Sequence, residues 1–314
     1  MNELKVGLAQ ISSVWLNKEK TILKVMDYIH QAAEEKCGLV IFGEAVLPAY
    51  PFWLSITNGA VFNDQVQKEI HAHYIKNAVC ITDGDLDRIC KLAKQKSIAI
   101  YLGTIERPAD RGGHSLYCTL VYIDADGIIQ STHRKLRPTY EERLTWAAGD
   151  GHGLKTHTIG DFTVGGLNCW ENWMPLSRTA LYAQGENVHV AVWPGYVRNT
   201  IDITPFIAKE SRSYSIGVCG LFKKEQITSD IPHYDLMQEN CPDVMADGGT
   251  CISAPNGEWI IEPIANKEGL FTAELNIQKV YEERQNFDAV GHYSRPDVTK
   301  LIVNRERQSL VDFK

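Results

Sequence analysis

The sequence predicts an α/β domain with a mixed sheet, and three features of the chain indicate this class. Short apolar segments with strand character alternate with segments whose apolar residues recur at helical spacing. Hairpin turn signals stand at residues 124–127 and 255–257, so some neighbouring strands run antiparallel. The 314 residues contain no linker rich in Pro, Gly or Ser and no internal repeat, which favours one large domain.

The N-terminal part of the chain alternates strand, helix and strand. Residues 4–9 form a short apolar run with a period of two, and residues 39–42 (Leu-Val-Ile-Phe) indicate a buried strand. Between them, Asn17 is placed to cap a helix that begins at Lys18. Gly38 stands where the C-terminal cap of that helix is expected. A helix that starts at Asp83 or Asp85 follows, and then come strands at 98–103, 115–123 and 128–133.

The second half of the chain continues this pattern up to a charged tail. A strand at 163–167 precedes a helix that Pro175 opens and that extends to residue 184. The later elements are a strand at 188–192, a helix at 203–214, and strands at 216–222, 250–254 and 259–264. The chain after Val280 is charged and weakly periodic, so we expect a domain over 1–280 and a tail over 281–314.

Composition and charge exclude several classes of protein. The chain has 32 Lys and Arg against 39 Asp and Glu, a net charge of −7, and no long basic run, so no nucleic-acid partner is expected. No apolar stretch approaches the ~20 residues of a membrane span, and the N-terminus lacks the pattern of a secretory signal. We therefore expect no membrane partner.

The cysteines and histidines do not follow metal-ligand spacing. None of the eight cysteines forms a C-x-x-C pair, so we expect mostly buried, reduced thiols in a cytoplasmic protein. His71 and His73 have no carboxylate and histidine partner at helical spacing. No metal site is predicted.

Three chemically reactive residues stand at the ends of predicted apolar strands. Glu44, Lys135 and Cys169 each occupy such a position, and α/β sheets bind ligands at the carboxyl ends of their strands. The three side chains are therefore predicted to converge. Cys169 is the candidate nucleophile; because a free thiol titrates near ~8.5, it needs Glu44 as a base or Lys135 as a cation nearby. Each residue taken singly also has a purely structural explanation. Cys169 could be a buried thiol, Glu44 an exposed loop carboxylate, and Lys135 part of a solvated basic stretch.

Aromatic residues cluster in sequence around the same segments. They are candidates to wall an apolar substrate pocket, although core packing explains each of them nearly as well. The candidate substrate-binding residues are Tyr50, Trp146, Trp170, Trp193 and Pro194. The Gly-rich residues 149–153 lack both a preceding strand and G-x-G-x-x-G spacing, so they predict a tight loop and not a nucleotide site.

Taken together, these segments resemble the nitrilase superfamily of carbon-nitrogen hydrolases, whose catalytic residues are Glu, Lys and Cys in that chain order. Residues 42–44 resemble the glutamate segment, with Gly43 where Pro is common, residues 133–143 the lysine segment, and residues 168–171 the cysteine segment. Cys-Trp-Glu, Arg-Pro-Thr-x-x-Glu-Arg and, at 291–297, Gly-His-Tyr-x-Arg-Pro-Asp are similar to the true nitrilase branch.

The resemblance implies a four-layer α-β-β-α sandwich and a reaction. Glu44 is expected to act as general base, Lys135 to stabilise an anionic intermediate, and Cys169 to attack the substrate. Glu142, seven residues after Lys135, matches a second glutamate that orients the site, whereas Glu141 does not. The implied reaction hydrolyses an organic nitrile to a carboxylic acid and ammonia through a thioimidate and a thioester, with no metal or organic cofactor.

Other functions stay open at this point. The same three residues serve an amidase or an N-carbamoyl hydrolase, and a cyanide-degrading relative is a narrower alternative. A scaffold that kept the fold without the activity is the non-enzymatic alternative. The resemblance also implies a homodimer or larger homo-oligomer, with the tail over 281–314 as an interface segment.

Overall fold

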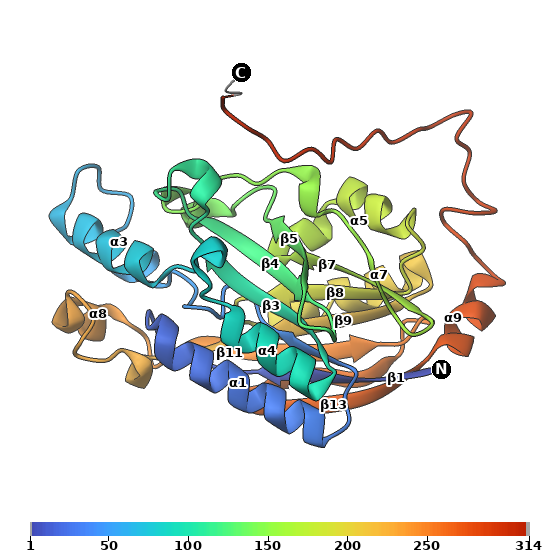
Figure 1. The fold of residues 1–314 in the computed structure, drawn as a ribbon, viewed down its shortest axis with the longest axis horizontal. Helices are drawn as coiled ribbons and strands as arrows, with labels where there is room; N and C mark the ends of the chain where they lie inside the picture. The colour runs from blue at the N-terminus through green and yellow to red at the C-terminus, as the bar shows by residue number, and fades with distance from the viewer. Residues whose placement is uncertain (1, 312–314) are drawn as a thin grey trace.

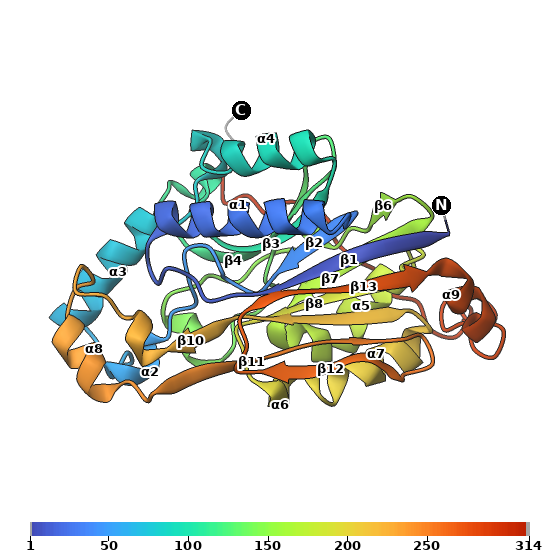
Figure 2. The ribbon, with the colours of Figure 1, turned by 90° about the horizontal axis from the view of Figure 1, so that it is seen from below.

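Two mixed β-sheets stack face to face between outer layers of helices in the computed structural model, which describes residues 2–311 (Figures 1 and 2). Within those residues the first sheet has six strands in the order β13-β1-β2-β3-β4-β5. These are β1 (Glu3–Gln10), β2 (Leu39–Phe42), β3 (Ala99–Glu106), β4 (Tyr117–Ile123), β5 (Ile129–Arg134) and β13 (Gly269–Asn276).

The second sheet has the order β10-β11-β9-β8-β7-β6, and β12 pairs with β11. Its strands are β6 (His157–Ile159), β7 (Phe162–Asn168), β8 (Val188–Trp193), β9 (Tyr214–Cys219), β10 (Leu221–Lys223), β11 (Val244–Ser253) and β12 (Trp259–Ala265). In each sheet three central strands are parallel, β1-β2-β3 in one and β7-β8-β9 in the other, and antiparallel strands flank them.

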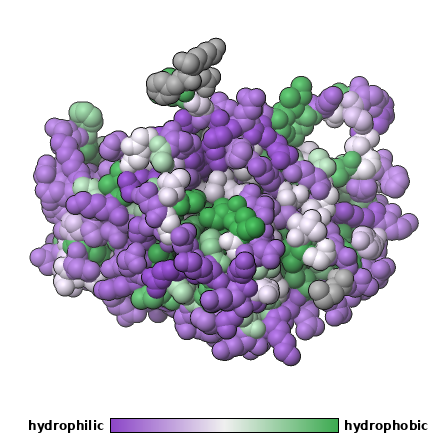
Figure 3. Space-filling view, in the orientation of Figure 1, coloured by the Kyte–Doolittle hydropathy of each residue, from purple (hydrophilic) through white to green (hydrophobic). Residues whose placement is uncertain are grey.

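Helices cover the outer face of each sheet. In Figure 2, α1 (Lys18–Glu34) and α4 (Asp87–Lys96) lie over the first sheet, while α5 (Pro175–Tyr182), α6 (Val197–Thr200) and α7 (Ile203–Ser211) lie on the second. The predicted four-layer α-β-β-α sandwich is therefore confirmed. At one end of the molecule lie α2 (Trp53–Ile56), α3 (Gln65–Asn77) and α8 (Tyr234–Asn240), and α9 (Ile277–Arg284) lies at the other (Figure 2). Hydrophilic side chains dominate the surface in Figure 3, with apolar ones in separate patches.

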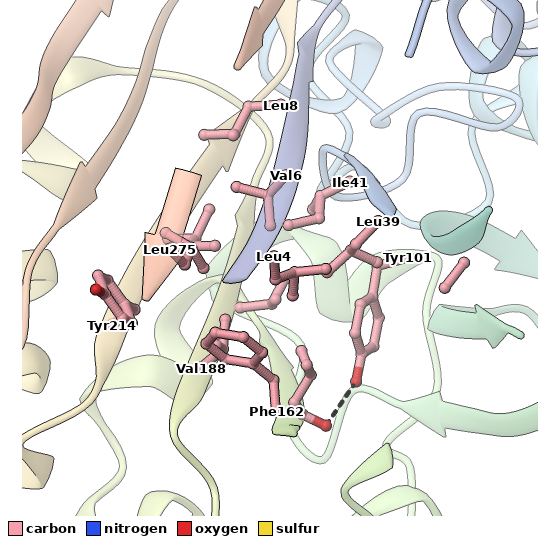
Figure 4. Packing of buried hydrophobic residues seen from close by; sticks show 14 of the residues in the cluster. Leu4, Val6, Leu8, Leu39, Ile41, Tyr101, Phe162, Val188, Tyr214 and Leu275 are labelled. Atoms are coloured by element: carbon pink, nitrogen blue, oxygen red, sulfur yellow. Dashed lines mark hydrogen bonds between the residues drawn. The ribbon is translucent and has the colours of Figure 1, made fainter. Parts of the chain in front are cut away.

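The main core lies between the two sheets. Alternate side chains of each strand point inward, because a strand has a side-chain period of two. Leu4 and Val6 of β1 pack in one cluster with Val188 of β8 (Figure 4). The hydroxyl of Tyr101 on β3 donates to the carbonyl of Val164 on β7 at 3.3 Å, so this polar group is paired inside the core. A second cluster joins α1 and α4 to the outer face of the first sheet.

Strand direction determines where the reactive residues meet. β2 and β3 are parallel, and β3, β4 and β5 are successively antiparallel, so β2 and β5 point to the same edge of their sheet. Glu44 and Lys135 follow these two strands and thus lie at one edge. The hairpin predicted at residues 124–127 joins β4 to β5 and turns the chain back toward this edge. The prediction is confirmed: Gly127 has a φ of 77°, and its N–H donates to the carbonyl of Asp124.

Local signals were correct at the start of α1 and wrong at its end. The Asn17 side chain accepts a hydrogen bond from the backbone N–H of Lys20, as a helix cap does. The helix stops at Glu34, and Lys36 adopts a left-handed φ of 61° two residues before the predicted Gly38 cap. Gly38 instead lies against β1, where a Cβ atom would be 2.8 Å from Leu4 Cδ1. Close packing, not helix capping, therefore explains this glycine.

Tertiary contacts changed other boundaries. The helix predicted at 203–214 ends at Ser211, because Arg212 has a φ of 51° and the chain enters β9 at Tyr214. The strand predicted at 216–222 is divided into β9 and β10. The sequence patterns also missed β13, α3 and α8. Residue 280, at which the expected domain ends, lies in α9, and the division into a domain and a tail stays a prediction.

Candidate active site

Glu44, Lys135, Glu142 and Cys169 come together in one buried cluster. The Lys135 Nζ atom lies 2.8 Å from Glu44 Oε1 and 2.7 Å from Glu142 Oε2. One oxygen of each carboxylate and the Cys169 Sγ atom all lie within 4.8 Å of one another. None of the four residues is more than 3% exposed. Side chains that are far apart in the sequence therefore form one charged group at the edge of the sheets.

Glu142 is held by three donors. It lies in the short 3₁₀ helix η3 (Tyr140–Leu144), and the backbone N–H of Thr139 donates to its Oε2 atom at 2.6 Å. The hydroxyl of Tyr50 donates to Oε1 at 2.8 Å, and Lys135 supplies the third contact. Its neighbour Glu141 is only partly buried and does not reach Lys135. The capping turn therefore selects which carboxylate faces the lysine.

Cys169 begins the 3₁₀ helix η5 (Cys169–Trp173) directly after β7, with a left-handed φ of 51°. That region is unfavourable for a residue with a Cβ atom, and such strain concentrates at functional sites. The sharp turn directs the backbone N–H of Trp170 to the sulfur. The geometry thus presents the thiol together with a hydrogen-bond donor.

Glu171 connects the cysteine turn to the lysine strand, and sequence interpretation did not assign it a role. Its buried carboxylate accepts from the backbone N–H of Asn168 at 2.9 Å and of Leu136 at 2.6 Å. His133 Nε2 lies 3.0 Å from the same carboxylate. Leu136 follows Lys135, and Asn168 precedes Cys169. This single side chain therefore fixes the spacing between the two reactive segments.

The electrostatics of the cluster favour a thiol beside an ammonium group. Burial and the negative charge of Glu44 raise the pKa of Cys169 well above its usual value, although Lys135 and the Trp170 N–H act in the opposite direction. Burial alone would lower the pKa of Lys135, but Cys169, Glu44 and Glu142 raise it well above its usual value. The surrounding acidic groups therefore favour the charged form of Lys135.

Glu44 is the group that titrates near neutrality. Burial raises its pKa to about 7, with a further increase from Glu142, and Lys135 and Cys118 act against this change. Such a value suits a carboxylate that exchanges protons at neutral pH. Cys118, on β4, directs its Sγ atom to Glu44 Oε1 at 3.5 Å, so Oε1 receives both Lys135 and Cys118. Within residues 2–311 no protein group donates to Glu44 Oε2, which leaves that oxygen available to take a proton.

Three of the predicted wall residues lie close to this cluster. The Trp146 ring has its centroid 5.6 Å from Lys135 Nζ and packs edge to face with Tyr50. The carbonyl of buried Trp193 accepts from the backbone N–H of Glu44 at 3.2 Å. The same close approach explains Gly43, because a Cβ atom there would lie 3.1 Å from the Trp193 carbonyl oxygen. The turn that carries Glu44 is thus pressed against β8.

The remaining two wall residues lie in different surroundings. Pro194 lines a small cavity of about 20 Å³ together with Glu44 and Tyr50, enough space for roughly one water molecule. The Trp170 side chain is half exposed, and its ring stacks on that of Trp173 with centroids 6.3 Å apart. Trp170 therefore faces the cluster with its backbone N–H, while much of its ring faces solvent.

A metal ion would have to compete with Lys135 at this site. Glu44, Glu142 and Cys169 offer three potential ligand atoms. The ammonium group already bonds to both carboxylates, so it takes the place that a cation would need. The donor set fits an internal ion pair better than a metal centre.

Comparisons with known proteins give the family. A carbon-nitrogen hydrolase family model matches residues 5–285. A nitrilase 2 from an unknown prokaryotic organism is 32% identical over 99% of this chain and 96% of its own length. Nitrilase 2 of Arabidopsis thaliana is 31% identical over 99% and 91%, and an aliphatic nitrilase of Rhodococcus rhodochrous is 31% identical over 99% and 82%.

Solved structures show the same fold. The C. elegans NitFhit protein matches with a TM-score of 0.70 and 15% identity, over 99% of this chain and 69% of that one. A carbon-nitrogen hydrolase from Helicobacter pylori G27 matches with a TM-score of 0.70 and 16% identity, over 94% and 96%. No helix among residues 2–311 has the length and apolar character needed to cross a bilayer. Its sequence matches place this chain in the carbon-nitrogen hydrolase (nitrilase) family.

Proposed function

We propose that this protein is a nitrilase, which hydrolyses an organic nitrile to a carboxylic acid and ammonia. The observation that carries the proposal is the buried cluster in which Lys135 bonds to Glu44 and Glu142 beside the Cys169 sulfur. Full-length relatives named as nitrilases support the choice of substrate class. Nucleophile, base and cation all come from the chain, so the chemistry requires no cofactor.

The first half of the reaction makes a thioimidate. Glu44 Oε2 removes the proton from the Cys169 thiol while Sγ bonds to the nitrile carbon, and the nitrile nitrogen then receives that proton from Glu44. Base-assisted attack suits a thiol whose pKa burial raises. Lys135 stabilises the negative charge that develops on the nitrogen, a contribution of several kcal/mol in such sites.

The second half releases the products. Water activated by Glu44 adds to the thioimidate carbon, and the tetrahedral intermediate expels ammonia to leave a thioester. A second water molecule cleaves the thioester and restores the Cys169 thiol. If the intermediate expels the thiol instead, an amide leaves. Glu142 orients Lys135, and the Trp170 N–H donates to the developing anion.

The aromatic side chains around the cluster are proposed to contact the organic part of the substrate. The Trp146 ring lies over Lys135, and Tyr50 and Pro194 line the small cavity beside Glu44. Trp193 packs in one cluster with Cys169, and the exposed ring of Trp170 supplies the outer surface. Aromatic walls suit both aryl and aliphatic groups.

A panel of nitriles, amides and N-carbamoyl compounds tests the proposal. We expect nitriles to be consumed with release of ammonia and the corresponding acid. Cleavage of amides or N-carbamoyl compounds with nitriles left intact would instead indicate an amidase or N-carbamoyl hydrolase. The panel also includes cyanide. If only cyanide is consumed, with formate or formamide as the product, the protein is a cyanide-degrading enzyme.

The pH–rate profile should report Glu44 directly. Because the base must be ionised and its pKa is about 7, kcat/KM is expected to fall about tenfold per unit as the pH decreases below about 7. In Cys118→Ala, Glu44 loses a donor that favours its ionised form, so this acid limb moves to higher pH. Cys118→Ser keeps a donor and should restore the limb toward the native position.

A matched control for this profile is Cys251→Ala. The Cys251 thiol is equally buried and contacts Thr204 Oγ1 at 3.5 Å, the same distance as between Cys118 and Glu44 Oε1. The control should leave the acid limb in place. An acid limb that does not move in Cys118→Ala contradicts the assigned hydrogen bond.

The tail supports a proposal for assembly. Residues 289–305 and α5 border a groove of about 910 Å³ that includes the apolar side chains of Leu176, Tyr293 and Leu301. Leu176 is 64% exposed, and Figure 3 shows apolar side chains along the tail above α5. We propose that a second copy of the chain covers this surface, with the tail as interface segment. Light scattering after size-exclusion chromatography is expected to give a dimer or larger homo-oligomer at micromolar concentration, and a monomer contradicts this.

The thiol inventory supports a proposal for location. All eight cysteines are free, and seven of them are buried. Reduced thiols persist in reducing compartments, so we propose a cytoplasmic location.

A further inference from the structure

A buried polar chain runs from Glu186 to the backbone of Cys169, and the reaction proposed above does not use it. His189, on β8, has Nδ1 3.1 Å from both carboxylate oxygens of Glu186. Its Nε2 atom lies 2.8 Å from Asn172 Oδ1, and Asn172 Nδ2 donates to the Cys169 carbonyl at 2.8 Å. Glu186, His189 and Asn172 are all fully buried. A polar atom this deeply buried needs a hydrogen-bond partner, and each bond needs one donor and one acceptor.

The orientation of the Asn172 amide follows from its neighbours. Its Nδ2 atom faces two carbonyl oxygens, those of Cys169 at 2.8 Å and of Leu167 at 3.4 Å. The reversed amide would place Oδ1 against these two acceptors, which is unfavourable. Oδ1 therefore faces His189 and requires a donor from it.

Both ring nitrogens of His189 consequently face acceptors. A neutral imidazole carries only one N–H, whereas the imidazolium carries two. Within the described part of the chain, no other group donates to the Glu186 carboxylate; Arg284 and Ser213 bond to the backbone carbonyl of Glu186 instead. The Arg284 guanidinium acts on Glu186 through its charge but bonds to the backbone carbonyl, so it gives the carboxylate no hydrogen bond. A buried carboxylate needs a donor, and the Glu186 side chain therefore also requires a proton on His189 Nδ1.

The other polar groups near His189 have their own partners. The Tyr182 ring lies edge to face with His189, with centroids 6.4 Å apart, and its hydroxyl donates to Glu210. Arg178 bonds to Glu210 and to the backbone carbonyl of Asn172. Neither group therefore supplies the missing donor or acceptor to the imidazole.

We propose that His189 is held as an imidazolium between Glu186 and Asn172. Through Asn172 it acts as a positioning residue for Cys169: it fixes the carbonyl group of a residue in the strained left-handed conformation and so keeps the Trp170 N–H directed at the sulfur. The part that concerns catalysis rests on the proposed function, whereas the protonation of His189 does not.

Nitrogen NMR of the native protein tests the protonation without any variant. In protein labelled with ¹⁵N-histidine, His189 should show two protonated ring nitrogens at neutral pH, with N–H protons protected from exchange. The signal is identified by its loss in His189→Gln or its shift in Asn172→Asp. A neutral imidazole at this position overturns the proposal.

Reactivity of Cys169 tests the positioning role. Asn172→Asp keeps the acceptor that faces His189 and removes the Nδ2 donor, and His189→Gln removes one of the two ring donors. Each should slow alkylation of Cys169 by iodoacetamide, measured by peptide mass spectrometry, about tenfold or more, and should lower kcat with little change in KM. His157→Gln is the matched control, because His157 stacks on Tyr122 in a separate cluster.

The outcomes separate this proposal from the proposed function. If both variants are alkylated at the native rate, the positioning role is wrong. This holds also when their unfolding temperature is lowered, because such a change alone is a structural effect. An imidazolium together with slowed alkylation, in a protein that cleaves no nitrile, supports the positioning role and contradicts the nitrilase proposal.

Discussion

Replacing Cys169 with alanine is expected to abolish the release of ammonia from any nitrile that the native protein cleaves, with a loss of about 10⁴-fold or more. The reason is that the proposed route forms two covalent bonds to one sulfur atom in turn, a thioimidate and then a thioester. Glu44 and Lys135 can still orient water around a bound nitrile, but neither group replaces a covalent intermediate. Intact-mass measurement after rapid quenching should detect an acyl adduct on the native protein and none on the variant.

The control for this experiment is Cys251→Ala, which removes a thiol that is buried to the same degree but contacts Thr204 and no catalytic group. It should retain both ammonia release and the adduct. Ammonia release by Cys169→Ala at the native rate, or an adduct mapped to another residue, would show that the nucleophile is misassigned.

Replacing Lys135 with methionine should be damaging in two separate ways. The side chain of Lys135 is fully buried and forms ion pairs with both Glu44 and Glu142. Removing one partner of a buried ion pair typically lowers the free energy of unfolding by about 3–5 kcal/mol, because an uncompensated charge stays behind. The variant also loses the cation that is proposed to stabilise the anionic intermediate, so kcat should fall by about 10²–10³-fold or more.

A combined variant separates these two effects. The triple variant Lys135→Met, Glu44→Gln and Glu142→Gln removes the two carboxylates as well. Its free energy of unfolding, measured in urea, should be higher than that of Lys135→Met alone, while activity stays absent. Lys279→Met is the surface control, since Lys279 pairs with Glu282 at a similar 2.9 Å but in solvent, and it should leave both properties unchanged. Native activity in Lys135→Met would exclude the proposed role of the lysine.

Sequence reasoning predicted that Glu44, Lys135 and Cys169 converge, and the structure brings them together; the prediction was possible because the signals are local. An apolar run followed by Glu44, or by Cys169, indicates a strand end whatever the rest of the chain does, and parallel strands bring such ends to one edge. The choice of Glu142 over Glu141 came from the resemblance to the nitrilase superfamily and not from the residues alone. In the structure it coincides with the capping turn in which the Thr139 N–H bonds to Glu142.

The residues that support this cluster carried no comparable signal. Cys118 looked like any other apolar cysteine, and its contact with Glu44 joins residues 74 positions apart. His189 lies in an apolar strand, where a single polar residue is compatible with many roles. Glu171 was visible only as part of the Cys-Trp-Glu motif. Its bonds to Leu136 and Asn168 exist because the cysteine and lysine turns meet at the edge of the sandwich.

By itself, the sequence determined the class of fold, the alternation of strands and helices, and the three reactive side chains at strand ends, because each depends on residues that are neighbours along the chain. Only the tertiary structure decided which Glu44 oxygen receives Lys135 and Cys118, which donors surround each carboxylate, and how the Cys169 carbonyl is held. The physical reason is that these properties depend on contacts between segments brought together by sheet register and packing, and a hydrogen bond forms or fails over a few tenths of an ångström.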